Sequence, residues 1–310
     1  MVQQFSHFDY VPFVFVLVAV AEHYYRFGGV SPINQQNREL VAAIGQELGD
    51  DLPVYWGNRN WHPLIDETLD VMIADGIRNC LFFITSAFRS YSGCRQYREA
   101  IAEACGNRTG DVPQFSKLRA YFNHPRFVEA WCDRTRSGLD QFDAADRQRI
   151  QVLFTAHSIP QAMANASPYV AQLNELAGLI SDRVGIAPDA WRLVYQSRSG
   201  PPHQPWLEPD VCDVIPQMAE GGARHVLLVP IGFLSDHIEV LFDLDVEAAE
   251  VAEQWGVQLV RARTLGTHPD FVRMIGELVE ERQAGGVERP ALGALGPAPD
   301  ECPPDCCKYR

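Results

Sequence analysis

Two kinds of apolar pattern alternate along this chain. Short runs rich in valine, leucine and phenylalanine, such as 226–230, are each followed by a longer stretch with helical spacing. In the stretch 168–184, for example, Leu173, Ala177 and Ile180 recur at intervals of four and three residues. Strands that alternate with helices in this way form parallel sheets with helices on both faces. The pattern therefore predicts an α/β protein.

The expected elements fall into two similar runs. Strands are expected at 13–20, 53–56, 80–85, 118–122, 152–156, 193–196, 226–230 and 257–262. Helices are expected at 35–48, 63–74, 93–105, 125–142, 168–184, 210–219, 236–254 and 270–282. We expect one lobe over 1–145 and a second over 146–283. The remainder, 284–310, begins with a stretch rich in Gly, Pro and Ala, which predicts a flexible arm that carries the last cysteines.

Composition narrows the class of protein. Of the 310 residues 46% are hydrophobic and 21% charged, which is the balance of a globular chain. The net charge of −14 argues against a nucleic-acid partner and is compatible with a small cationic substrate such as a metal ion. The apolar run 11–21 is interrupted by Pro12 and is too short for a transmembrane helix. No basic segment precedes it, so we expect a cytoplasmic protein without a transmembrane segment.

Polar groups follow several strands at the edge where parallel sheets bind ligands. His157 follows one strand, and His237 and Glu239 follow another, so the topology places them at one crevice. A histidine there can equally cap a helix, and Asp236 with Glu239 has the spacing of a capping box. Asp243 lies four residues after Glu239, where two like charges on one helix face are unfavourable. A catalytic base, a metal path or a proton relay would give this acidic row a use.

Four motifs in order are similar to those of the ferrochelatases. They are 28–34 (GGVSPIN), 154–160 (FTAHSIP), 195–201 (YQSRSGP) and 230–245 (PIGFLSDHIEVLFDLD). The resemblance implies two Rossmann-like lobes with a cleft between them, and an enzyme of haem biosynthesis that inserts Fe²⁺ into a porphyrin and releases two protons. It is also compatible with transient contact with other enzymes of that pathway.

Two further segments resemble one branch of that family, found in Actinobacteria and other monoderms. They are 54–63 (VYWGNRNWHP) and 90–97 (SYSGCRQY). The resemblance implies that coproporphyrin III, rather than protoporphyrin IX, is the preferred substrate, which gives coproheme as the product.

The same resemblance assigns roles to individual residues. His157 matches the catalytic histidine, and Glu239 matches the acid that faces it across the ring, so both would contact Fe²⁺. Asp243 stands where the family often has Glu and would continue a path for protons or metal.

Four other residues are implied to contact the porphyrin. Tyr24, Ser31 and Tyr97 match positions that hold its propionates or its face. Trp206 is expected to line the cleft, although core packing is the commoner role of a tryptophan.

Three of the eight cysteines, Cys302, Cys306 and Cys307, crowd the end of the chain. They indicate a cluster that needs one more ligand, a zinc site, or simply reactive thiols in a tail. Some ferrochelatases hold a [2Fe–2S] cluster with three C-terminal cysteines and one internal cysteine. By that resemblance we expect Cys132, 25 residues before His157, to be the fourth ligand.

The chain departs from the family at its start. The run 11–21 joins Glu22 almost directly, so the Gly-rich first loop of the family is missing or replaced, although 13–20 is still expected to fill the first strand position. A binder of haem or another tetrapyrrole that lost turnover with this loop therefore stays open as an alternative. A chelatase for cobalt or another divalent metal is a second alternative, because ligand type discriminates poorly between such ions.

Overall fold

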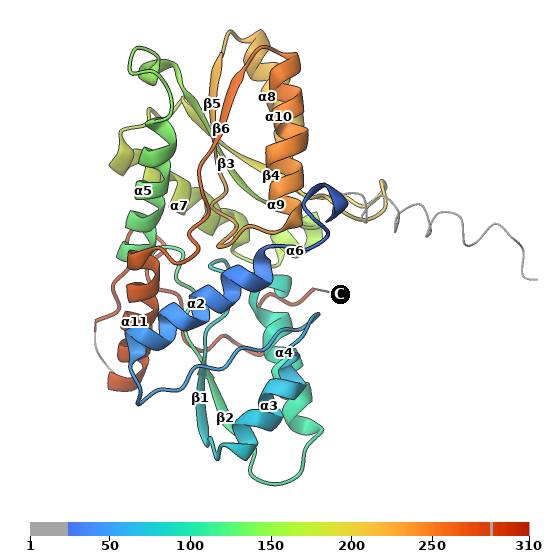
Figure 1. Ribbon diagram of the computed structural model, residues 1–310, viewed down its shortest axis with the longest axis vertical. Helices are drawn as coiled ribbons and strands as arrows, with labels where there is room; N and C mark the ends of the chain where they lie inside the picture. The colour runs from blue at the N-terminus through green and yellow to red at the C-terminus, as the bar shows by residue number, and fades with distance from the viewer. Residues whose placement is uncertain (1–23, 286–287, 310) are drawn as a thin grey trace, which may run out of the picture.

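A computed structural model describes residues 24–285 and 288–309, and the segment expected as the first strand, 13–20, lies outside these residues. Each of the two lobes has its own parallel sheet (Figure 1). The α/β class with parallel sheets is confirmed.

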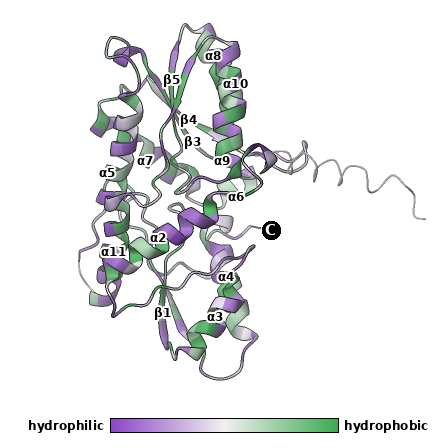
Figure 2. Ribbon diagram, in the orientation of Figure 1, coloured by the Kyte–Doolittle hydropathy of each residue, from purple (hydrophilic) through white to green (hydrophobic). Residues whose placement is uncertain are grey.

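The larger sheet contains four parallel strands in the order β4–β3–β5–β6. They are β3 (Gln151–His157), β4 (Trp191–Gln196), β5 (His225–Val229) and β6 (Gln258–Arg261). The central strands β3 and β5 are almost fully buried, because helices cover both faces of the sheet. In Figure 2 the helices around this sheet show alternating bands of hydrophobic and hydrophilic residues.

Two helices of this lobe lie close to the ranges expected at 168–184 and 210–219, whereas the helix expected at 236–254 is divided and the short helix after β3 was not expected. The helices are α6 (Gln161–Asn165), α7 (Tyr169–Val184), α8 (Val211–Glu220), α9 (Ile238–Phe242) and α10 (Ala248–Gln254). A short 3₁₀ turn, η2 (Arg147–Arg149), precedes β3. The Asp210 side chain accepts a hydrogen bond from the backbone N–H of Cys212, so it caps α8 at its first turn.

The other lobe has two described strands, β1 (Asn79–Phe82) and β2 (Gln114–Lys117), which pair in parallel. Its helices are α2 (Ile33–Leu48), α3 (Ile65–Ala74), the π-helical turn η1 (Tyr91–Arg95) and α4 (Gln96–Gly106). The strand expected at 118–122 is wrong in position. Leu118 still donates its backbone N–H to the Phe82 carbonyl at 3.1 Å, and the next residue, the buried Arg119, pairs with Glu281.

Two helices tie the lobes together, α5 (Pro125–Leu139) and α11 (Pro269–Ala284). Helix α5 packs against α7 and β5, whereas α11 comes back to pack against α2 and α5. The helix that ends the predicted second lobe therefore lies on the first lobe. The division near residue 145 stays a prediction.

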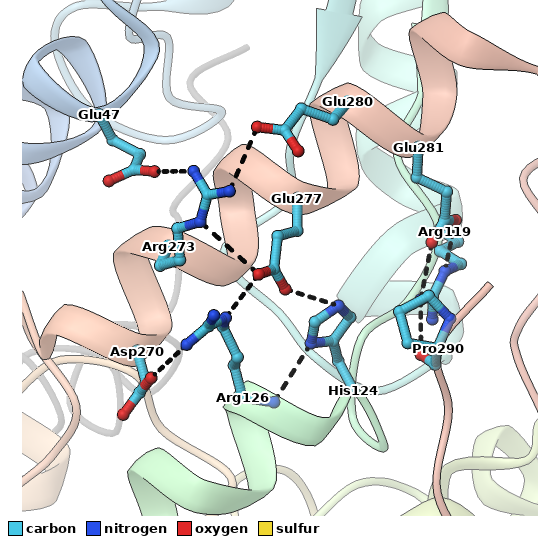
Figure 3. Close-up of polar contacts among 10 residues, drawn as sticks. All are labelled: Glu47, Arg119, His124, Arg126, Asp270, Arg273, Glu277, Glu280, Glu281 and Pro290. Carbon is cyan, nitrogen blue, oxygen red and sulfur yellow. Dashed lines mark hydrogen bonds and ion pairs between the residues drawn. The ribbon is translucent and has the colours of Figure 1, made fainter. Parts of the chain in front are cut away.

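A network of ion pairs joins α5 and α11 (Figure 3). Arg126 on α5 contacts Glu277 at 2.6 Å and Asp270 at 2.8 Å on α11. The fully buried Arg119 guanidinium forms a two-pronged contact with Glu281 at 2.7 and 3.0 Å. Such paired, fork-shaped contacts fix the relative position of two elements more firmly than a single surface ion pair does.

The segment 288–300, expected as a flexible arm, is instead bound to the body. The Nδ2 of Asn123 donates to the carbonyls of Leu292 and Gly296 at 3.0 and 2.8 Å. The Glu175 carboxylate accepts the backbone N–H groups of Ala294 and Leu295, both at 2.9 Å. These contacts satisfy backbone groups that a Gly- and Pro-rich segment cannot satisfy itself, which is why it lies in one place. Within the described residues no helix is long and apolar enough to cross a membrane.

Candidate functional site

His157 is the last residue of β3, at the edge of the larger sheet that faces the other lobe. Its Nδ1 contacts the carbonyl of Ser158, and a carbonyl only accepts, so Nδ1 carries the proton in this contact. The Tyr169 hydroxyl donates to the His157 carbonyl at 3.0 Å and fixes the backbone there. The Nε2 lone pair is therefore free, and the side chain is 34% exposed, so it can accept a proton or bind a metal ion.

Glu239 and His237 approach this Nε2 from the segment between β5 and α9. Oε2 of Glu239 lies 3.8 Å from His157 Nε2 and 3.6 Å from His237 Nδ1. The Phe233 ring lies against both imidazoles, with centroid distances of 6.5 Å to His157 and 5.1 Å to His237. Two imidazoles and a carboxylate thus converge on one partly exposed point, as the topology predicts.

Glu239 does not cap its own helix. The expected capping box of Asp236 and Glu239 is wrong, because α9 begins one residue later than that motif requires and His237 occupies the N-cap position. Asp236 is engaged elsewhere: its backbone N–H donates to Gln36 Oε1 at 2.8 Å, and its carboxylate pairs with Arg261 at 3.1 Å. Glu239 is therefore left 56% exposed and available to a ligand.

Asp243 begins a π-helical turn, η3 (Asp243–Glu247), where one continuous helix was expected. Its carboxylate accepts a hydrogen bond from the hydroxyl of Ser197, whose backbone has the left-handed φ of 60°. Residues with such backbone conformations are common at functional sites. Here the Ser197 hydroxyl is the donor to the Asp243 carboxylate. The pKa of Asp243 is raised from 3.8 to about 7, mainly by burial and in smaller part by the neighbouring Glu247 and Glu239, while the hydrogen bond from Ser197 opposes the rise.

The surroundings of His237 lower the pKa of its imidazole. Burial lowers its pKa below the ordinary value of a histidine, and the nearby Glu239 opposes this effect only in part. A neutral His237, a His157 with a free Nε2 and an Asp243 that titrates near neutrality make a site that can take up and pass on protons.

The four residues predicted to contact the porphyrin do not all lie beside His157 and Glu239. Tyr24 belongs to a short helical segment that lies on the larger lobe, where the adjacent Arg26 contacts Phe242 and Glu250. Ser31 caps the turn before α2, and Gln36 on α2 contacts Asp236.

The other two predicted contacts behave differently from each other. Trp206 forms a bridge to Pro160 shortly after His157, and its Nε1 is buried without a hydrogen-bond partner among the described residues. Tyr97 instead lines a cavity of the smaller lobe beneath Arg59, whose guanidinium lies 5.0 Å from the ring centroid.

Sequence reasoning missed two residues that position the acids. Gln36 holds Asp236 from 200 residues away, and Ser197 holds Asp243 from 46 residues away. The signal for Ser197 was its place at the carboxyl end of β4, the same edge as His157. Gln36 carries no comparable signal, because a surface glutamine on a helix is unremarkable in sequence.

Among the cysteines the prediction for Cys132 is corrected. It lies on α5 with none of its surface exposed, packed in the main hydrophobic core, and burial raises its pKa to about 12. The internal cysteine that meets the terminal ones is Cys94, in the π-helical turn η1. Cys132 sits in an apolar helix stripe, which marks core packing, whereas Cys94 follows the loop after β1.

The four thiols form two pairs, Cys94 with Cys307 and Cys302 with Cys306. The Cys307 thiol donates to the Cys94 sulfur, and this lowers the pKa of Cys94 to about 6, while Lys117 favours the same thiolate. Within the described part of the chain, no three or more such ligands already stand in the geometry of a metal site. A metal centre here therefore requires the two pairs to move together.

The chain is similar to known proteins along most of its length. A family profile described as Ferrochelatase matches residues 13–283. A protein named Ferrochelatase from Rhodopirellula baltica is 52% identical over 297 residues, which cover 94% of this chain and 84% of that protein. A protein named Coproporphyrin III ferrochelatase from Streptomyces griseus is 46% identical over 317 residues, which cover 95% of this chain and 84% of that protein.

Solved structures share the arrangement of the lobes. SirB from Bacillus subtilis, solved with Fe³⁺, aligns with a TM-score of 0.59 at 12% identity and covers 83% of this chain and 93% of its own. At this identity the likeness concerns the fold alone, and it confirms the predicted chelatase-type architecture.

Proposed function

Because this chain belongs to the ferrochelatase family, enzymes that insert iron into a porphyrin, we propose that its substrates are Fe²⁺ and coproporphyrin III and its product is coproheme. The relatives named coproporphyrin III ferrochelatase support the choice of porphyrin. The observation that carries the chemistry is the free Nε2 of His157 facing Glu239 at 3.8 Å.

The reaction replaces two pyrrole N–H protons by one Fe²⁺ ion, so two protons must leave the ring. His157 Nε2 accepts one of these protons, since its lone pair points into the site and Nδ1 is held by Ser158. Glu239, whose Oε2 lies 3.8 Å from that Nε2, takes a proton or guides the incoming ion. A flat ring must also be bent to expose its nitrogen lone pairs, at a cost of roughly 1–5 kcal/mol that binding of the rest of the ring supplies.

Asp243 carries protons away from Glu239 or delivers the ion to it. Its pKa of about 7 lets the carboxyl group gain and lose a proton near neutral pH, and Ser197 holds it in place. Glu247, which ends the same π-helical turn, extends the row of acids. An Asp where the family often has Glu keeps the charge and shortens the reach.

Tyr24 and Ser31 are proposed to contact the propionates from the larger lobe's side of the site and the start of α2. Trp206 contributes a wall beside His157, supported by its bridge to Pro160. Tyr97 retains its assignment from the family resemblance, with support only from its motif, because it lines a different cavity.

An anaerobic assay with Fe²⁺ tests this proposal, with coproporphyrin III and protoporphyrin IX as parallel substrates. We expect faster metallation of coproporphyrin III, and a loss of about 10²–10⁴ in rate for His157→Ala. The matched control is His62→Ala, because His62 also contacts a carboxylate, Glu67 at 2.9 Å, but on the surface. Tight porphyrin binding without metallation would instead indicate a non-catalytic binder, and faster insertion of Co²⁺ would indicate a chelatase for another metal.

We propose in addition that Cys94, Cys302, Cys306 and Cys307 hold a [2Fe–2S] cluster. Four thiolates are the donor set of such clusters. Support comes from the two thiol pairs and from the low pKa of Cys94, since the thiolate is the form that binds metal. When bound, the cluster supplies a rigid link between the terminal segment and η1, and no part of metal insertion is assigned to it.

The matched variants Cys94→Ser and Cys132→Ser test this assignment. We expect the purified protein to contain iron and acid-labile sulfide with visible absorbance, which Cys94→Ser loses and Cys132→Ser keeps. Stoichiometric zinc in place of iron would contradict the proposed iron–sulfur cluster. Loss of absorbance in Cys132→Ser but not in Cys94→Ser would show that Cys132 is the fourth ligand. None of the eight cysteines forms a disulfide bond, as is usual in a reducing compartment, so we propose a cytoplasmic location for the enzyme.

A further inference from the structure

The loop between β4 and α8, residues 198–206, begins and ends close to His157, and we call it the β4 loop. Gln196, the last residue of β4, is paired with His157 across the sheet. Trp206, at the other end of the loop, forms a bridge to Pro160. Because the two ends flank the residue that carries the proposed base, the position of the β4 loop affects the space available to a ligand there.

Most of the β4 loop is exposed to solvent. Residues 198–203 and Pro205 are exposed, whereas Gln204 is half-buried. Within the loop, Arg198 Nη2 donates to the carbonyls of Pro202 and Gln204 at 3.3 and 3.1 Å. These bonds keep the shape of the loop, but they do not fix its place on the protein. An exposed loop of this kind is mobile unless a contact from outside holds it.

The Gln204 side chain connects the wall of the site to the end of the chain. A Cβ atom on Gly200 would lie 3.1 Å from the Trp206 ring and 3.5 Å from Gln204 Oε1, so the Gly200 backbone lies against both side chains. Gln204 Nε2 donates a hydrogen bond to the hydroxyl of Tyr309 at 3.1 Å. Gln204 therefore links the β4 loop and its neighbour Trp206 to a residue more than one hundred positions away.

Tyr309 is itself held on the smaller lobe. Its half-buried ring lies 6.1 Å from the ring of Tyr91 in η1, measured between centroids. Just before it, the carbonyls of Pro304 and Cys306 accept hydrogen bonds from Arg95 Nη1 at 2.9 and 2.8 Å. Figure 1 shows the last red segment of the chain ending between α4 of the smaller lobe and α6 of the larger lobe. Tyr309 thus joins η1 of one lobe to the β4 loop of the other.

We propose that Tyr309 is a positioning residue, whose hydroxyl holds Gln204 and thereby keeps the β4 loop in place beside His157. This inference rests on the proposed function, because it assigns the loop to one wall of the porphyrin site. Tyr309 takes no part in proton transfer, which stays with His157 and Glu239. A tyrosine suits the position because its ring packs on Tyr91 while its hydroxyl accepts from the amide, and Tyr309→Phe separates the two contributions.

Amide exchange on the full-length protein without substrate tests the contact directly. Tyr309→Phe keeps the ring and removes the hydroxyl. We expect the backbone N–H of Gln204, which donates to the Pro201 carbonyl at 3.1 Å, to exchange about two- to tenfold faster, the range for one neutral hydrogen bond. Lys308→Ala is the matched control, since Lys308 is the exposed neighbour of Tyr309. Equal exchange rates of this N–H, measured by NMR, in both variants would overturn the inference.

Steady-state kinetics separate positioning from a general loss of stability. We expect Tyr309→Phe to raise KM for coproporphyrin III about two- to tenfold and to change kcat less than twofold, because His157 keeps its contacts with Ser158 and Tyr169. The melting temperature should stay within about 1 °C of the parent. An unchanged KM, or a loss of kcat alone, would overturn the positioning role.

The outcome remains decisive if the parent enzyme does not metallate the porphyrin. That result would contradict the proposed function, and the dissociation constant of coproporphyrin III, measured by fluorescence quenching, then takes the place of KM. A weaker dissociation constant in Tyr309→Phe than in Lys308→Ala would support the role of Tyr309 in placing the loop. Equal constants would contradict it.

A double variant shows whether Tyr309 acts through Gln204. Gln204→Leu removes the donor of the same hydrogen bond, so we expect it to raise KM to a similar extent as Tyr309→Phe. The two changes together should raise KM no more than either change alone, because both remove one interaction. Additive effects would show that Tyr309 acts through another contact and would contradict the proposed link.

Discussion

Nε2 of His157 and Oε2 of Glu239 stand 3.8 Å apart, too far for a direct hydrogen bond and close enough to share one ligand. The two residues come from different strand ends, β3 and the segment after β5. Other contacts hold each residue in place. His157 contacts the Ser158 carbonyl and accepts a hydrogen bond from Tyr169 at its own carbonyl. The segment before Glu239 is held by the hydrogen bond from the Asp236 backbone N–H to Gln36.

Replacing Glu239 by Gln should slow iron insertion without loosening the fold. The amide keeps the size of the side chain but cannot take a proton, so we expect kcat to fall by roughly 10²–10⁴. The 56% exposed side chain makes no contact that stabilises a helix cap, so the melting temperature should stay within about 1 °C of the parent. Steady-state metallation and thermal unfolding measure the two effects. A large loss of stability would show that the Glu239 side chain does stabilise the fold.

The activity should rise with pH through about 7 because Asp243 must lose its proton before it can accept another. Asp243→Asn should remove this limb of the pH profile. Asp245→Asn is the control, since Asp245 lies in the same turn but pairs with Arg261 outside the acidic row. A profile unchanged in the Asp243 variant would exclude this carboxyl group from the proton path.

The same carboxyl group should make stability depend on pH. Its pKa is raised on folding, so the folded protein binds this proton more tightly than the unfolded chain does. Its favourable contribution is complete below about pH 4 and is lost as the pH rises to about 7. At pH 8 Asp243→Asn should therefore be more stable than the parent, by of order 2 kcal/mol, and at pH 4 the two should be similar. Urea unfolding at both values measures this.

The buried pair of Arg119 and Glu281 should matter far more than a surface pair of the same geometry. Arg119→Met leaves a carboxylate buried without its partner, which typically reduces the free energy of unfolding by about 3–5 kcal/mol. Arg78→Met is the control, because its contact with Asp111 at 2.6 Å is exposed on both sides and should be worth about 0–1 kcal/mol.

A double variant separates the ion pair from its burial. Arg119→Met with Glu281→Leu removes both charges, so we expect it to regain much of the stability lost in the single variant. A double variant as unstable as Arg119→Met would show that packing, or the bond from Arg119 to the Pro290 carbonyl at 2.9 Å, carries the effect.

The segment 288–300 should come loose when Glu175 is removed. Glu175→Ala deletes the acceptor for the backbone N–H groups of Ala294 and Leu295, so proteolysis within this segment should become faster. Asn174→Ala is the control, since Asn174 donates to its own helix at the Val170 carbonyl. Limited proteolysis with mass analysis locates the cuts, and equal cleavage in both variants would show that Glu175 does not hold the segment.

Several features followed from the sequence because they depend on local patterns. Helical and strand periodicities gave the α/β class, and the rule that parallel strands bind ligands at their carboxyl ends brought His157 and Glu239 to one site. The helix expected at 210–219 was equally local, and α8 covers Val211–Glu220.

Other features were wrong or missed because they depend on long-range partners. Asp236 could have capped its helix, but Gln36 and Arg261 engage it instead. The last segment looked flexible by composition, yet side chains from α7 and from the residues before α5 hold its backbone. Composition predicts the flexibility of a segment in isolation. It does not predict which hydrogen-bonding groups from the rest of the fold will contact that segment.

The cysteines show the division between the two sources most clearly. The sequence by itself determined that three thiols end the chain and that His157 and Glu239 belong to one site. Only the tertiary structure decided that Cys94, and not Cys132, meets those thiols. Spacing along the chain does not fix which surfaces a terminal segment crosses, because that path is set by contacts between residues about two hundred positions apart, such as Arg95 with the Cys306 carbonyl at 2.8 Å.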